Sequence, residues 1–260
     1  MSEENMKSLI KTFDILELFL KGKDELSVTE ISQALGLNIT TVSRILSKLA
    51  KRGYLRQVEK RGKFCLGTIF LEFSGIVKRQ LKLREIAMPY LFELNRLVKE
   101  SVIIAVWDRR GPLVTETIHK ANYTDSPLKI VPDEGISIPL YCTCSGKIIL
   151  AAMTEEEFHK YINEIKIERR TPNTITNIQK IKEQLVTVAR EGVAFDDEEY
   201  AIGVRGIASG IRDNEGKIVG SLGVVAPSVR MSLNGMMDLV PTIKKYANEI
   251  SRRIGYQDKL

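Results

Sequence analysis

Residues 27–66 of this 260-residue chain read SVTEISQALGLNITTVSRILSKLAKRGYLRQVEKRGKFCL. The first four residues form a capping box, in which a Ser hydroxyl and a Glu carboxylate each bond a backbone N–H group at the start of a helix. This box predicts a helix that runs to about Leu35. Gly36 then suits a left-handed turn, and Asn38 is a typical cap for a further helix.

The helix expected after Asn38 has one apolar and one polar face. Its apolar residues, at positions 42, 45, 46 and 49, have the spacing of a helix that packs on a core. The opposite face carries hydroxyl groups and cations, which suit base edges and phosphates in a DNA major groove. The candidate DNA-contacting residues on this face are Thr40, Thr41, Ser43, Arg44, Ser47 and Lys48.

A basic hairpin is expected after Gly53, where the helix ends. Residues 54–58 and 63–66 are predicted to form two strands, joined by the turn Glu59-Lys60-Arg61-Gly62. We expect Arg61 and Lys63 to reach the DNA backbone or the adjacent minor groove. The hairpin is therefore the wing of a winged helix-turn-helix.

The excess positive charge of the chain lies in its first third. A helix predicted from about Lys7 to Leu20 completes a winged helix-turn-helix domain over residues 1–66. From Met1 to Glu85 there are 16 Lys and Arg against 10 Asp and Glu, a net charge of +6 that equals the net charge of the whole chain. A helical protein-interaction module with a solvated basic face is the alternative. The capped turn, the hydroxyl-rich face and the basic wing together favour double-stranded DNA as the partner.

Residues 67–83 are predicted to form a linker helix. Apolar residues at positions 69, 70, 73, 76, 77 and 81 follow one helical stripe, which must be buried somewhere. The stripe can pack on its own domain or on the same helix of a second subunit. We favour the second arrangement, because a two-fold dimer carries two recognition helices and suits a palindromic operator.

Residues 84–260 are expected to form a larger α+β domain with an antiparallel sheet. The predicted strands are 101–107, 113–119, 136–141, 206–212 and 217–225, with hairpin turns at 108–111 and 213–216. The predicted helices are 83–99, 145–152, 154–165, 177–191 and 233–254, the last with Pro241 as an expected kink.

The start of the predicted helix at residue 145 offers an anion site. The N–H groups of residues 143–146 can bind a ligand carboxylate. The alternative is simple capping of the helix by Thr143 or Ser145. A phosphate loop is excluded because Tyr141 stands where its first Gly is required and Ile148 where Ser or Thr binds magnesium.

Metal binding and catalysis are not expected. Cys142, Cys144, His119 and His159 match no zinc pattern, and no nucleophile motif is present. We therefore predict no cofactor, no metal and no enzymatic activity, with the three cysteines as free thiols. No signal peptide and no apolar run near the roughly 20 residues of a membrane span are seen, so a cytoplasmic location without membrane contact is expected.

Five short motifs carry a resemblance to a known family. They are LREIAMPYL (83–91), SGK (145–147), TPNTIT (171–176), GVAFDDEE (192–199) and GVR (203–205). In these motifs, and almost end to end, the chain resembles the IclR family of transcriptional regulators. That resemblance implies a winged helix domain joined to an effector-binding domain similar to GAF and PAS folds.

The resemblance also implies where an effector binds. The candidate effector-binding residues, taken from the resemblance and from the start of the helix at residue 145, are Tyr141, Cys144, Ser145, Gly146, Asp196, Gly206, Gly223 and Val225. Many family members have Cys at the position of Gly206, and some sensors of small acids have Ser at those of Gly223 and Val225. These departures predict a roomier, more apolar pocket, for an effector larger than a two- or three-carbon acid.

The expected function is that of a dimeric or tetrameric transcriptional regulator whose DNA binding responds to a small metabolite, with a carboxylate as the candidate. A DNA-binding regulator that senses no ligand remains an alternative. An enzyme tethered to DNA and using the acidic cluster around Asp196 is a second one.

Overall fold

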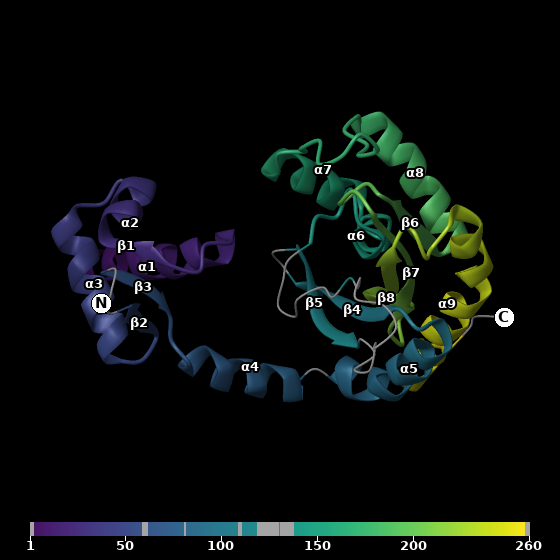
Figure 1. The fold of residues 1–260 in the computed structure, drawn as a ribbon, viewed down its shortest axis with the longest axis horizontal. Helices are drawn as coiled ribbons and strands as arrows, with labels where there is room; N and C mark the ends of the chain where they lie inside the picture. The colour runs from purple at the N-terminus through teal and green to yellow at the C-terminus, as the bar shows by residue number, and fades with distance from the viewer. Residues whose placement is uncertain are drawn as a thin grey trace. The chain divides into compact units, whose positions relative to one another are not determined.

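The computed structural model describes residues 3–58, 62–80, 82–108, 111–118, 130 and 138–257. These residues divide into two compact units, 1–80 and 81–260 (Figure 1). Arg61 of the expected wing tip and His119 lie outside the described residues. Within the described ranges, no helix is both long and apolar enough to cross a membrane.

The first unit is a winged helix-turn-helix. Its elements are α1 Glu3–Leu18, the 3-10 turn η1 Phe19–Lys21, β1 Leu26–Ser27, α2 Val28–Leu35, α3 Ile39–Lys51, β2 Leu55–Val58, β3 Lys63–Leu66 and α4 Ile69–Gln80. The predicted helices and wing strands are confirmed. The sequence analysis missed the two-residue strand β1, which pairs with β3 and gives an antiparallel sheet in the order β1-β3-β2.

Side-chain caps fix the turn between α2 and α3. The Ser27 hydroxyl accepts a hydrogen bond from the Glu30 N–H at 3.2 Å, and the Glu30 carboxylate accepts one from the Ser27 N–H at 2.8 Å. Gly36 has φ +62°, and the Asn38 side chain accepts a hydrogen bond from the Thr40 N–H at 2.8 Å. The capping box, the left-handed glycine and the second cap are therefore confirmed.

The core of the first unit forms where the three helices meet. The predicted apolar face of α3 is buried, together with Ile15 of α1 and Ile31 of α2. The apolar residues in the first half of α1 behave differently, because Leu9, Ile10 and Phe13 remain exposed. Helical spacing thus predicted α1 correctly but did not show that this half of it lies off the core.

The start of α4 is held against the first unit. Gly67 lies so close to Gly53 that a Cβ atom would overlap the Gly53 carbonyl group, and its N–H donates to the Tyr54 carbonyl at 2.9 Å. The ring of Tyr54 contacts Phe70 edge-on and stacks on Phe73, with centroid distances of 5.8 and 6.3 Å.

The second part of α4 keeps its apolar side chains exposed. Ile76 is 45% exposed and Val77 is 52% exposed. The apolar stripe of the linker helix is therefore only partly covered by its own unit at its first turn and is open to solvent beyond it.

The second unit is an antiparallel sheet covered by helices on both faces (Figure 1). Its elements are α5 Lys82–Val98, β4 Ser101–Asp108, β5 Gly111–Ile118, α6 Cys144–Leu150, α7 Glu155–Glu164, α8 Ile178–Glu191, β6 Val193–Asp197, β7 Val204–Arg212, β8 Ile218–Pro227 and α9 Leu233–Arg253. The strand order is β5-β4-β8-β7-β6. The expected α+β fold is confirmed.

The two faces of this sheet differ in the size of their side chains. Large apolar residues such as Ile104, Ile207 and Val224 face α5 and α9 and form the main core. Small residues such as Ala194 and Ala208 face α6 and α8. The short helix α6 therefore lies close to the sheet.

Two expectations for this unit need correction. The segment 136–141 was predicted as a strand, but Leu140 and Tyr141 lie in a turn before α6, and residues 136 and 137 lie outside the described part. Strand β6 was not predicted, because it is only five residues long and ends in two Asp residues. It forms the edge of the sheet and carries Asp196.

Candidate functional site

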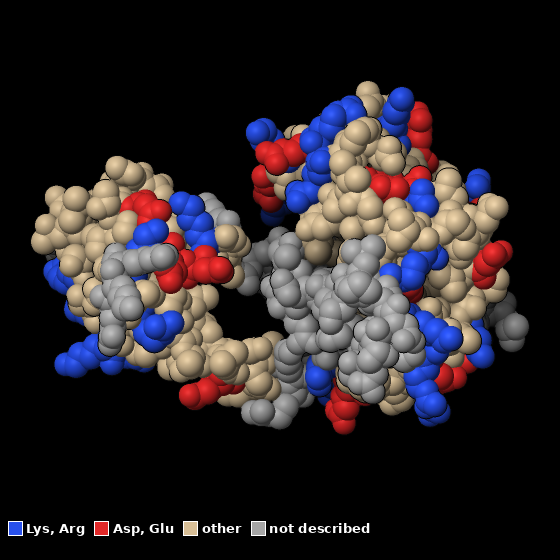
Figure 2. Space-filling model, in the orientation of Figure 1, with Lys and Arg blue, Asp and Glu red and all other residues tan. Residues whose placement is uncertain are grey.

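The polar face of α3 is open to solvent in the first unit. Thr40, Ser43, Arg44, Ser47 and Lys48 are exposed and Thr41 is half-buried. The buried face of the same helix holds them in place, since Val42, Ile45, Leu46 and Leu49 pack in the core. Figure 2 shows Lys and Arg side chains along the rim of this unit where α3 and β2 lie.

Lys63, at the base of the wing, contacts an acidic side chain. Its ammonium lies 3.7 Å from the Glu30 carboxylate, and that of Lys23 lies 3.6 Å from the same carboxylate. Hydrogen bonds from the Ser27 backbone and hydroxyl, with smaller contributions from the two lysines, lower the pKa of Glu30 to about 2. Glu30 therefore stays ionised, and a DNA phosphate would compete with it for Lys63.

In the second unit, the sheet register brings three of the candidate effector residues into one row. Asp196 of β6 pairs with Gly206 of β7, and Gly206 pairs with Val225 of β8. Directly paired residues of an antiparallel sheet point to the same face. This row and the neighbouring row that contains Gly223 both belong to the face beneath α6.

The two glycines of this face allow α6 to approach. A Cβ on Gly206 would lie 2.8 Å from the Cys144 sulfur, and one on Gly223 would lie 3.1 Å from the hydroxyl of Ser145 and 3.1 Å from Cγ1 of Ile103. The volume left by each glycine is thus filled by neighbouring side chains. The two glycines therefore let α6 pack closely on the sheet, and the roomier pocket expected from them stays a prediction.

The start of α6 is capped by its own sequence. The Thr143 hydroxyl accepts a hydrogen bond from the Gly146 N–H at 3.1 Å and donates one to the Pro139 carbonyl at 2.7 Å. A Cβ on Gly146 would lie 2.5 Å from Leu140 Cα. Capping by Thr143 is therefore what the structure shows, and the Gly146 N–H is not free to bind a ligand carboxylate.

Tyr141 lies in a separate apolar cluster with Leu140 and Ile181. Its hydroxyl donates to the Glu168 carbonyl at 3.0 Å and accepts from the Glu168 N–H at 3.2 Å. Burial raises the pKa of this hydroxyl, so it stays protonated. Both hydrogen bonds hold the chain after α7 in place.

Asp196 caps the turn that follows β6. Its Oδ1 atom accepts hydrogen bonds from the N–H groups of Glu199 and Tyr200, at 2.8 and 3.2 Å. Burial raises the pKa of this carboxyl to about 7, although the two backbone bonds oppose the shift. The acid is therefore poised to gain or lose a proton near neutral pH.

Sequence reasoning missed the largest buried side chain of this region, Lys147. Only 1% of it is exposed, and its ammonium donates to the Phe195 carbonyl at 2.8 Å and forms an ion pair with Glu199. A signal was present in the sequence, because Lys147 directly precedes the apolar run IILAA. A cation in the buried half of such a helix requires an acid from elsewhere in the chain.

Two buried hydroxyl groups near α6 lack hydrogen-bond partners among the described residues. They belong to Ser145 of α6 and Ser221 of β8. Ser221 pairs with Gly210, which points to the same face of the sheet as Ala208. Ser145 lies over Gly223 on that face. Both serines therefore belong to the layer between α6 and the sheet. Buried polar groups are normally bonded, so unpaired ones need an explanation, and a ligand is one.

The cysteines and His159 show no arrangement for metal binding. All three cysteines are free thiols, as predicted, and burial raises the pKa of both Cys142 and Cys144 to about 12. His159 is exposed and lies 3.1 Å from Glu155. Across the described parts of the chain, no three His, Cys, Asp or Glu residues are placed to hold a metal ion.

Comparison with known proteins gives one consistent result. The model of the IclR helix-turn-helix domain matches residues 8–59, and the model of the bacterial transcriptional regulator IclR C-terminal domain matches residues 76–252. Over 255 residues the chain is 28% identical to the HTH-type transcriptional regulator KdgR of Escherichia coli, covering 98% of this chain and 95% of that protein.

Solved structures agree with the sequence matches. The crystal structure of the Thermotoga maritima IclR is 27% identical, with a TM-score of 0.69, and the match covers 96% of this chain and all of that one. An IclR homologue from Microbacterium hydrocarbonoxydans, crystallised with 4-hydroxybenzoate, has a TM-score of 0.75 at 22% identity, over 95% of this chain and 98% of that one.

Replacing Lys147 with Met leaves the buried Glu199 carboxylate without its cation. We expect Lys147→Met to lower the free energy of unfolding by about 3–5 kcal/mol, measured by urea denaturation at pH 7.5. Adding Glu199→Gln should recover most of the loss. The control is Lys166→Met, which removes an exposed ion pair with Glu168 and should cost less than about 1 kcal/mol. Equal losses in the two single variants would contradict the prediction.

The raised pKa of Asp196 predicts a pH dependence of stability. Because its folded pKa of about 7 lies above the ordinary value of 3.8, the stability it contributes is fully present below pH 3.8 and lost as the pH rises through 7. Asp196→Asn keeps an acceptor for the Glu199 N–H and should flatten the fall in unfolding free energy between pH 4.5 and 8. The exposed Asp238→Asn is the control. Parallel profiles for Asp196→Asn and the parent chain would refute this.

Proposed function

We propose that this chain, which belongs to the IclR family of transcriptional regulators, changes its affinity for an operator DNA when a small metabolite binds beneath α6. The family assignment makes it a DNA-binding regulator. The observation that carries the metabolite site is the pair of unpaired, buried hydroxyl groups of Ser145 and Ser221.

The DNA contacts that we propose come from the polar face of α3. Arg44 can bond the O6 and N7 atoms of a guanine, and the exposed hydroxyls of Thr40, Ser43 and Ser47 can bond bases or phosphates. Lys48 is the phosphate contact on the same face. Arg61 and Lys63 add wing contacts, for which Lys63 exchanges its Glu30 partner for a phosphate.

The metabolite that we propose is an organic carboxylate larger than three carbons. The hydroxyls of Ser145 and Ser221 supply its hydrogen bonds. Cys144 and Val225 add apolar contact. Asp196, paired with Gly206 at the edge of the sheet, supplies an acid that titrates near neutral pH. The related protein crystallised with 4-hydroxybenzoate supports a carboxylate of this size. Tyr141 and Gly146 offer no free polar group to the metabolite, because their own polar groups are already bonded.

Control of DNA binding follows from linkage. A metabolite shifts DNA affinity only if it binds the DNA-binding and the non-binding conformations unequally, and DNA then changes metabolite affinity by the same factor. A regulator with no such response is the alternative.

A homodimer fits the open end of α4. Ile76 and Val77 are exposed on an apolar stripe, and pairing that stripe with its copy would bury both and place two recognition helices on one palindromic operator. Phe73 belongs to the same stripe but also supports the first unit through Tyr54. A tetramer of two such dimers is compatible with this pairing.

Two substitutions on α3 should have different effects on DNA binding. With an operator selected by the protein from random DNA, Arg44→Ala should weaken binding about 10- to 100-fold and relax base preference at one position. Lys48→Ala should weaken binding to all sequences and reduce the slope of log affinity against log salt by about 1. The control is Lys160→Ala in the second unit, measured by fluorescence anisotropy. If neither α3 variant differs from Lys160→Ala, this face does not bind DNA.

Charges placed on the open end of α4 should separate the subunits. Ile76→Glu with Val77→Glu should convert the assembly to a smaller species by light scattering and weaken operator binding. Phe73 is left unchanged because its ring packs on Tyr54. Leu71→Glu is the matched control, since Leu71 is 73% exposed on the opposite side of the helix. An unchanged mass for the double variant would exclude this dimer contact.

The metabolite site is tested by native mass spectrometry and a ligand panel. The panel runs from glyoxylate and pyruvate to substituted benzoates, with operator affinity and melting temperature as readouts. Ser221→Ala should weaken the active ligand by about tenfold, because one buried hydrogen bond is lost, whereas the exposed Ser74→Ala should not. A panel that changes neither readout would favour a regulator without a ligand, and tight binding of glyoxylate or pyruvate alone would reject the larger carboxylate.

A further inference from the structure

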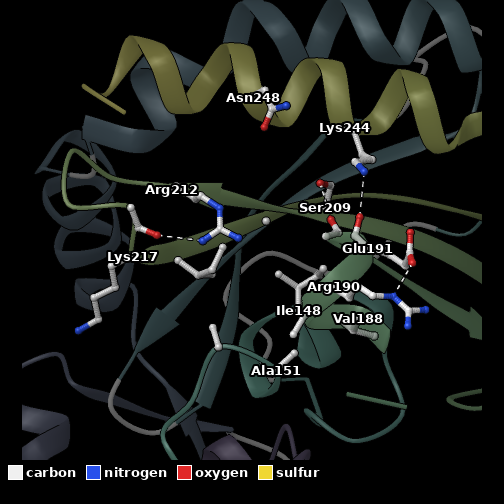
Figure 3. A pocket seen from close by; sticks show the side chains of 16 residues that line it. Ile148, Ala151, Val188, Arg190, Glu191, Ser209, Arg212, Lys217, Lys244 and Asn248 are labelled. Carbon is white, nitrogen blue, oxygen red and sulfur yellow. Dashed lines mark hydrogen bonds and ion pairs between the residues drawn. The ribbon is translucent and has the colours of Figure 1, made fainter. Parts of the chain in front are cut away.

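A hollow in the second unit is lined by residues other than those of the proposed metabolite site, although its Gly210 is the strand partner of Ser221. It has a volume of about 440 Å³ and is lined by the end of α6, the end of α8, the β7–β8 hairpin and one face of α9 (Figure 3). Arg212, which lines the hollow, is six residues from Gly206 on β7, about 20 Å along the strand from the Asp196 row, and Ser209, also in the lining, is three residues from Gly206, about 10 Å along the strand. None of the candidate effector residues lines it.

The lining of this hollow is strongly basic. It contains four cations, Arg190, Arg212, Lys217 and Lys244, against one acid, Glu191. The Arg190 guanidinium lies 2.8 Å from the Glu191 carboxylate, so these two charges offset each other. The remaining cations give the hollow a net positive charge. Residues 86–260 as a whole are neutral, because Lys and Arg there equal Asp and Glu in number.

Two of the cations keep donors available while being held in place. The Arg212 guanidinium uses NH1 to bond the Gly216 carbonyl at 2.9 Å, which fixes its plane and leaves its other N–H groups for an acceptor. The Lys244 ammonium bonds the Glu191 carbonyl at 2.9 Å and has two further protons. In Figure 3 the Arg212 guanidinium lies in the middle of the hollow, whereas Lys217 points away from it.

The opposite wall is apolar. Ile148 of α6, Ala151 directly after α6 and Val188 of α8 lie across from Arg212 (Figure 3). Ser209 and Asn248 add uncharged polar groups. The volume is that of a typical small-molecule site. A planar guanidinium facing an apolar wall suits a ligand that has an anionic group on a compact apolar body.

We infer that this hollow binds a small organic anion, such as an aromatic carboxylate, through Arg212 and Lys244. The anionic group lies against Arg212, Lys244 adds positive charge at the Glu191 end of the hollow, and the apolar body lies on Ile148 and Val188. This site shares no residue with the metabolite site beneath α6, so the two proposals can be tested separately.

The test uses benzoate as the probe, with benzylamine as its cationic counterpart. Calorimetry on the full chain should show benzoate binding that weakens at least tenfold in Arg212→Gln and in Lys244→Gln. Lys245→Gln is the matched control, because Lys245 is exposed on the same helix and does not line the hollow. Ala151→Phe should block binding by filling the hollow without changing its charge. Benzylamine should not bind.

Hydrogen exchange separates this site from the one beneath α6. Benzoate should protect peptides that cover residues 209–218 and 244–248. Protection confined to residues 143–147 and 196–206 would place the probe at the metabolite site and overturn the inference. Equal benzoate affinity in Arg212→Gln, Lys244→Gln and Lys245→Gln would overturn it as well, as would equal binding of benzylamine.

Discussion

The buried ion pair between Lys147 and Glu199 ties α6 to the connection after β6, and the rest of the second unit is arranged around it. Two opposite charges in a dry interior are stable only when both are present and further bonded. The Phe195 carbonyl provides such a bond to Lys147, and the backbone of Glu199 is fixed by the Asp196 carboxyl. The TPNTIT motif adds a second clamp, since the Thr171 hydroxyl donates to the Glu198 carbonyl at 2.6 Å and the Thr174 hydroxyl donates to the Glu199 carbonyl at 2.7 Å. One pair thereby positions a helix, a turn and the acid that faces the proposed ligand.

The helices of the first unit are also held in place by polar contacts, but these contacts are local and bury no ion pair. There, short helices are positioned by local caps, such as Ser27 with Glu30 and Asn38 with Thr40, whose partners are two or three residues apart. Close backbone packing replaces long-range polar contacts, as where Gly67 meets Gly53. The recognition helix can therefore present an almost wholly polar face outward, because its position does not depend on those side chains. The second unit, in contrast, must bury charge to hold α6 over its sheet.

This difference explains what the sequence could predict. Elements defined by near neighbours, such as α2, α3 and their caps, were predicted to within a residue or two. The role of Lys147 was missed because its partner, Glu199, is 52 residues away. The row of Asp196, Gly206 and Val225 could be grouped only by resemblance, since strand register is not visible in a sequence. The short strands β1 and β6 carry too few residues for an alternating pattern. Residues 140 and 141 looked like a strand, but the backbone there turns so that Gly146 can pack on Leu140.

The burial of two cysteines has a practical consequence. Cys142 and Cys144 are inaccessible and their thiols have a pKa of about 12, so neither supplies a thiolate at neutral pH. Cys65 of β3 is the remaining cysteine, and it is partly exposed in the wing. A maleimide dye added to the unmodified protein would therefore label the wing alone. The chain carries a built-in attachment point for a fluorophore, from which movements of the wing on and off DNA can be followed without mutating any residue.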